Sequence, residues 1–124
     1  MVMCKRCSKS DFKYDLNLAM LENNGCASII VSYSDCKKFI SILNEMSIEL
    51  DRECCSLLED DIKTAITYNY NMMITIYGNK TMMVEPIVYP NKINAFADMT
   101  YFIEIKATDD YAIASPRISF EIVE

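Results

Sequence analysis

Two cysteines near the start of the chain, in the segment "CKRC", have the spacing of half a zinc site. Cys4 and Cys7 are separated by two residues, and Cys36 lies further along in "VSYSDCKKF". Structural zinc is usually held by four ligands, two of which commonly come from one C-x-x-C segment. Tyr33 stands three residues before Cys36, at the position where a second C-x-x-C would have its first cysteine.

The sequence therefore predicts an incomplete metal site with Cys4, Cys7 and Cys36 as ligands, so zinc is the one cofactor it suggests. A redox pair is the weaker alternative, because such a pair normally lies at the start of a helix in a β-α-β unit. A chance spacing of thiols is a third interpretation in a chain with six cysteines.

Catalytic chemistry has little support in the sequence. The chain contains no histidine, which removes Ser-His and Cys-His nucleophile pairs, imidazole ligands and the usual general base. The glycine-rich phosphate loops and the G-x-S-x-G nucleophile motif are also missing from it. We therefore expect a protein that is not an enzyme.

Basic residues are concentrated in two short segments. The chain has eighteen acidic and twelve basic residues, a net charge of −6, which argues against RNA or DNA binding over the whole surface. Lys5, Arg6 and Lys9 surround the first cysteine segment, and Lys37 and Lys38 follow Cys36. Folding would bring them together at one basic end if the two segments are neighbours. That they are merely solvated lysines is an equally weighted alternative.

The hydrophobic pattern predicts the elements that would position these residues. Apolar and polar residues alternate over 12–18, which is typical of a strand, and "NNG" at 23–25 predicts a turn. We expect an all-β fold, mainly antiparallel and sandwich-like, with at most one short helix or an irregular excursion within 47–63. The other predicted strands cover 26–33, 37–43, 65–78, 80–90, 99–107 and 117–124.

Length and composition predict one domain over 1–124, with N-terminal hairpins in 1–45 and C-terminal strands in 64–124. Apolar residues make up 52% of the chain and charged residues 24%, as in ordinary globular domains. No apolar run is long enough to span a bilayer, and no secretion signal is evident. We therefore expect cytoplasmic localisation, where thiols stay reduced.

The segment "GCASIIVSYSDCKKFISI", together with "CKRC" before it, resembles the eukaryotic CXXC-motif zinc-binding protein family. "ITIYGNKTMMVEP" and "DDY" are similar to later segments of that family. Tyr33 departs from the family pattern, because it replaces the third of four zinc ligands. The positions that match in the central segment are Gly25, Ala27, Ser28, Cys36, Ser41 and Ile42.

The resemblance implies a small β protein, and the Ile-, Asn- and Met-rich composition agrees with a microsporidian member of the family. A microsporidian protein of this kind is a dormancy factor found on inactive ribosomes, at the tRNA exit (E) site. For this chain the resemblance implies ribosome hibernation: occupation of the exit site and inhibition of tRNA binding, without catalysis. Its partners would be rRNA and nearby ribosomal proteins. The expected rRNA-binding residues are Lys5, Arg6, Lys9, Lys37, Lys38 and Lys92.

Two other functions stay open. One is a stand-alone zinc- or thiol-binding protein that uses the three cysteines. The other is a generic protein-interaction module, in which the methionines and tyrosines of the strands form an adaptable face. Burial of these residues in a core is the favoured interpretation, by about three to one.

Overall fold

A mixed sheet and two helices make up the part of this protein that the structure describes. The computed structural model describes residues 3–51, 63, 71–87, 99–104 and 118–123. The elements within these ranges are β1 (Met3–Cys7), α1 (Lys9–Glu22), β2 (Ala27–Ser32), the 3₁₀ helix η1 (Tyr33–Asp35), α2 (Cys36–Glu45), β3 (Glu49–Leu50), β4 (Asn71–Ile76), β5 (Thr81–Pro86), β6 (Thr100–Glu104) and β7 (Ile118–Ile122).

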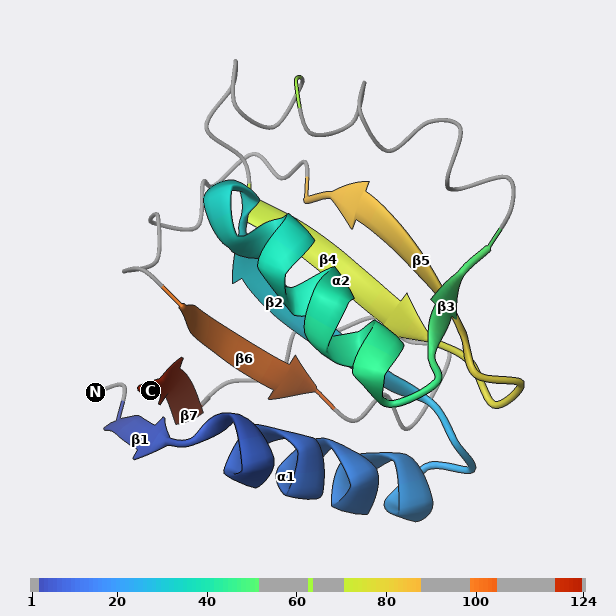
Figure 1. Ribbon diagram of the computed structural model, residues 1–124, viewed down its shortest axis with the longest axis horizontal. Coiled ribbons are helices and arrows are strands. Elements are labelled where there is room, and N and C mark those ends of the chain that lie inside the picture. Colours follow the sequence, from blue (N-terminus) through green and yellow to red (C-terminus); the bar gives the residue numbers. More distant parts are fainter. Residues whose placement is uncertain (1–2, 52–62, 64–70, 88–98, 105–117, 124) are drawn as a thin grey trace.

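The strands form a seven-stranded sheet in the order β1-β7-β6-β2-β4-β5-β3. β2 lies at its centre, antiparallel to both β4 and β6. The pairs β1–β7 and β3–β5 are parallel. Figure 1 shows α2 lying across β2 and β4, while α1 runs along the side of the sheet that carries β1. The prediction of an all-β sandwich is therefore wrong, since the fold is a mixed sheet with helices packed on it.

The first error concerns residues 12–18, which belong to helix α1 and not to a strand. Ser8 caps this helix, because its hydroxyl accepts from the Asp11 amide while the Asp11 carboxylate accepts from the Ser8 amide. Such a capping box fixes the start of a helix. Phe12, Leu16 and Ala19 then face the core at helical spacing.

The second error concerns residues 37–43, which lie within helix α2. β-branched and aromatic residues favour strands only weakly, and burial commonly overrides that preference. Here the apolar residues fall on one face of the helix, where they are covered by the sheet. The predicted N-terminal hairpins within 1–45 are thus replaced by a strand–helix–strand–helix sequence. The buried residues of α2 are Cys36, Phe39, Ile40, Ile42 and Leu43.

Several local predictions are confirmed. Residues 23–25 form a turn, β2 covers most of the strand predicted over 26–33, and β4 and β5 pair as an antiparallel hairpin. β5 ends at Pro86, as expected of a residue without an amide hydrogen. β6 and β7 fall inside the last two predicted strands. In the segment 47–63, where a short helix or an irregular excursion was predicted, residues 49–50 form strand β3. Residues 52–62 of that segment lie outside the described residues.

The main core lies between the sheet and the two helices. The rings of Phe12, Phe39 and Tyr101 meet edge to face there. The ring centroids are 5.4 Å apart for Phe12 and Phe39, 4.7 Å for Phe12 and Tyr101, and 5.2 Å for Phe39 and Tyr101. All three side chains are fully buried, and burying one such ring stabilises a fold by roughly 1.5–3 kcal/mol. This contact fixes α1 and α2 on the same face of the sheet.

The opposite face of the sheet carries a smaller apolar cluster. Ile30 lies between Ile29 and Val31 in β2, so its side chain is on the other face. It joins Met73, Ile87 and the half-buried Phe102. Met73 is buried, as are Met72 and Met82 in the main core, which confirms the core interpretation for these three methionines. Met83 and Tyr77 are exposed, so for them it is wrong.

Within the described ranges, neither helix is long and apolar enough to cross a membrane.

Candidate functional site

A groove of about 470 Å³ opens between the two helices. Its walls come from the first residue of α1 and from the exposed side of α2. Residues next to β6 and at the end of β7 complete it. The lining residues are Lys9, Lys37, Lys38, Ser41, Ile42, Glu45, Met99 and Ile122.

Three lysines give the groove its basic rim. Lys37 and Lys38 lie in the first turn of α2 and are exposed, because Cys36, Phe39 and Ile40 turn toward the core. Lys9 is the first residue of α1, directly after the cap at Ser8. Two local helix starts therefore bring together basic residues that are 28 positions apart in the chain.

Glu45 connects the two helices at this groove. Its carboxylate accepts from Lys13 Nζ at 2.7 Å and from Lys9 Nζ at 3.2 Å. The hydrogen bonds from Lys13 and Lys9 lower the pKa of Glu45 below its ordinary value of 4.5, so the carboxylate is charged at neutral pH. Any anion that approaches Lys9 must compete with this carboxylate.

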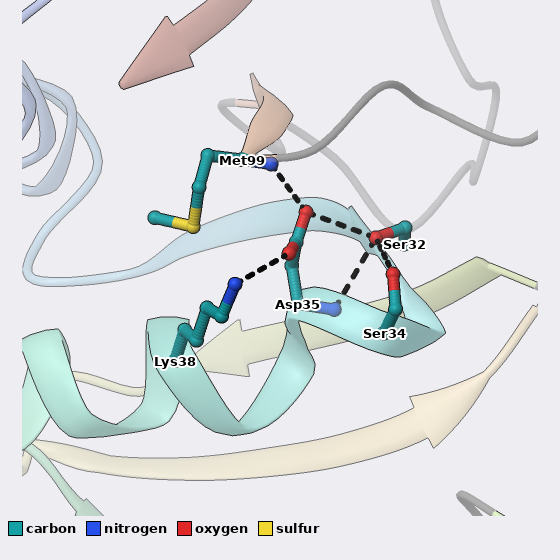
Figure 2. Close-up of polar contacts among 5 residues, drawn as sticks. All are labelled: Ser32, Ser34, Asp35, Lys38 and Met99. Atoms are coloured by element: carbon teal, nitrogen blue, oxygen red, sulfur yellow. Dashed lines mark hydrogen bonds and ion pairs between the residues drawn. The ribbon is translucent and has the colours of Figure 1, made fainter. Parts of the chain in front are cut away.

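Asp35 contacts two of the lining residues, Lys38 and Met99 (Figure 2). Its side chain is only 1% exposed, and it accepts from the Ser32 hydroxyl at 3.1 Å and from the Met99 amide. Lys38 Nζ lies 3.8 Å from its second oxygen. The carboxylate thus holds the start of α2, a rim lysine and the chain entering β6 in one arrangement. Because Met99 has a left-handed backbone with φ 58°, this hydrogen bond also helps to retain an unusual conformation.

The floor of the groove is apolar. Ile42 and Ile122 are buried, each 6% exposed, and the half-buried Met99 packs against the same core. The groove therefore offers two kinds of surface to a ligand: cationic groups at the rim and hydrocarbon below them.

The predicted basic residues have three different outcomes. Lys9, Lys37 and Lys38 line one groove. Lys5 and Arg6 belong to β1, the strand that directly precedes α1. Lys92 lies outside the described residues. The RNA-binding role of all six stays a prediction.

The predicted zinc ligands lie on two different elements. Cys4 and Cys7 belong to strand β1, whose backbone is extended, unlike the turn of a zinc knuckle. The Cys7 thiol is buried 3.1 Å from the Tyr101 hydroxyl, and Cys36 is buried at the start of α2. Tyr33 begins η1.

The described side chains include no group of three Cys, Asp or Glu residues arranged to hold a metal ion. The zinc site stays a prediction.

Sequence reasoning missed Glu45 and the apolar floor. The lysines were found because they are clustered along the chain. Met99 and Ile122 are distant from α2 in sequence, and only the sheet order brings them to it. The Ser8-Asp11 pair has the S-x-x-D spacing that predicts a helix start, and this signal would have placed α1 correctly. Ser32 and Asp35 have the same spacing, but Ser32 caps η1, the short 3₁₀ helix that directly precedes α2.

No protein-family model, curated protein or solved structure matches this chain.

Proposed function

We propose that this chain is a non-catalytic RNA-binding protein that associates with ribosomes, and that the groove between α1 and α2 contacts RNA phosphates. The single observation that carries the proposal is the gathering of Lys9, Lys37 and Lys38 on the rim of one groove. Lysine ammonium groups are suited to phosphate contacts, which supply most of the affinity of proteins for RNA irrespective of sequence.

A finer proposal concerns the place of binding. Hibernation of inactive ribosomes by occupation of the tRNA exit site rests on the family resemblance of the sequence. That resemblance implies β-hairpins in the segment from Cys4 to Ile42, which instead contains α1 and α2. The geometry therefore supports RNA contact in general and gives no separate support to the exit site.

A salt titration tests the RNA contact. Affinity for a labelled RNA strand should fall as salt rises, because each phosphate contact releases a counterion. Replacing Lys37 by glutamine should reduce the slope of log affinity against log salt by about 0.7, the value for one contact to a single strand.

Lys80→Gln is the matched control, because Lys80 is exposed in the turn between β4 and β5 and its loss changes the net charge equally. Equal effects of the two variants, or no RNA binding by the unmodified chain, would refute the proposal. Co-sedimentation of the chain with purified ribosomes tests the partner, and its recovery only in the ribosome-free fraction would refute that assignment.

A protein-interaction module is the second candidate, and one observation favours it. The outer face of α1 exposes Tyr14, Leu18 and Leu21, with exposed fractions of 64%, 41% and 79%. These residues are at helical spacing, so they form a continuous apolar stripe opposite the buried one. A Leu18→Lys, Leu21→Lys variant that retains the same protein partner in a pull-down as the unmodified chain would count against this candidate.

A further inference from the structure

The rim and the floor of the groove differ in chemistry, and the difference constrains what binds there. Contact with phosphates alone requires only exposed cationic or hydrogen-bond donor groups. Here the lysines of α2 stand beside an apolar floor made by Ile42, Met99 and Ile122. A volume of about 470 Å³ lies within the range of about 300–1,000 Å³ that is typical of sites for small organic groups.

We infer that the groove takes one unstacked nucleotide of single-stranded RNA, with its phosphate on the lysine rim and its base against the apolar floor. This inference rests on the proposed RNA-binding function. The bases of a duplex are stacked and paired inside it, so duplex RNA can offer the rim its phosphates but cannot offer the floor a base.

The lining also predicts how selective the groove is. None of the described lining residues is aromatic, so among these residues a base meets the Met99 thioether and isoleucine methyl groups and no ring. Contacts of this kind depend on the apolar faces that all bases share. The groove should therefore distinguish single strands from duplexes strongly and one base from another weakly.

Met99→Ala tests the floor. Met99 is half-buried, and its substitution shortens the side chain at the groove while retaining all three rim lysines. Affinity for a single-stranded RNA 12-mer should fall about threefold to tenfold, in line with the loss of part of an apolar contact. Affinity for the same strand in a duplex should not change.

Met83→Ala is the matched control, since Met83 is 42% exposed on β5 and is not among the groove residues. A second measurement needs no variant. The unmodified chain should bind an RNA 12-mer more tightly than the same backbone with abasic sites, which keeps the test valid if Met99→Ala does not fold.

The outcomes separate the two proposals. Equal affinity for the single strand, the duplex and the abasic strand would overturn the base-binding inference and leave RNA binding in place. Failure to bind any of the three would overturn the proposed function itself. Binding of AMP but not of the 12-mer would also overturn the inference, because it would assign the groove to a free nucleotide.

Discussion

Replacing Glu45 by glutamine should strengthen the binding of RNA. In the native groove both oxygens of this carboxylate accept from lysines, at 2.7 Å from Lys13 and 3.2 Å from Lys9. A phosphate that approaches either lysine must compete with this carboxylate. The pKa of Glu45 is lowered by these lysines, so at pH 7 the native side chain is charged and the substitution removes a full negative charge.

The structure sets the size of the effect. The variant releases two lysines, and each new contact with a single strand steepens the dependence of log affinity on log salt by about 0.7. The slope should therefore increase by up to about 1.4 if both lysines contact phosphates, and by about half of that if only Lys9, which lines the groove, does so. Affinity should rise most at low salt, where phosphate contacts are strongest.

Fluorescence anisotropy with a labelled RNA strand at several salt concentrations measures both quantities. Glu49→Gln is the control, because Glu49 is exposed on the short edge strand β3 and its loss changes the net charge by the same amount. The reasoning is refuted if the two variants raise affinity equally, since net charge would then explain the gain. An unchanged slope in Glu45→Gln would refute it as well.

Three further predictions concern the scaffold. Asp35→Asn should lower the free energy of unfolding by about 1–3 kcal/mol, measured by urea denaturation, because it weakens a buried hydrogen-bonded network; an unchanged midpoint would contradict this role. Tyr101→Phe should cost about 1 kcal/mol by removing the hydroxyl beside Cys7. Burial raises the pKa of Tyr101. The stability that the neutral hydroxyl contributes is therefore fully present below about pH 10, the pKa of an unfolded tyrosine, and is lost as the pH rises above it. Titration of all tyrosines near that pH in the folded chain would be inconsistent with burial of Tyr101. Gly25→Ala should cost about 1–3 kcal/mol, since Gly25 has φ 87° and an added Cβ would lie 2.9 Å from the Gly78 Cα; a melting temperature equal to that of the native chain would exclude this close approach.

Helix α1 shows why the sequence misled the fold prediction. Phe12 and Leu16 face the core, while Tyr14 and Leu18 are exposed on the opposite side. Together these two apolar stripes place an apolar residue at every second position from 12 to 18. The same alternation is the pattern expected of a strand. Periodicity could not separate the two structures, whereas the capping box at Ser8 could, because its side-chain bonds form only at a helix start.

The site was predictable only in part, for a related reason. Lysines clustered in the sequence remain neighbours once two helices begin at those clusters, so Lys9, Lys37 and Lys38 could be found from the chain alone. Glu45 meets Lys9 across 36 positions, and Met99 reaches Asp35 across 64. Such pairings depend on the sheet order and on helix packing, which no local pattern in the sequence specifies.

The net charge of −6 places a physical condition on RNA binding by this chain. At physiological salt a charge is screened over about 8 Å, so a phosphate in the groove responds chiefly to the rim lysines and to Glu45. Acidic residues further away act mainly at low salt, where they oppose the approach of RNA. The few phosphate contacts that three lysines permit give only a modest electrostatic gain, so useful affinity requires an additional term that salt does not screen. If the chain binds RNA as proposed, the apolar floor at Met99 would supply a term of this kind, and for this reason the proposal assigns base and phosphate to one site.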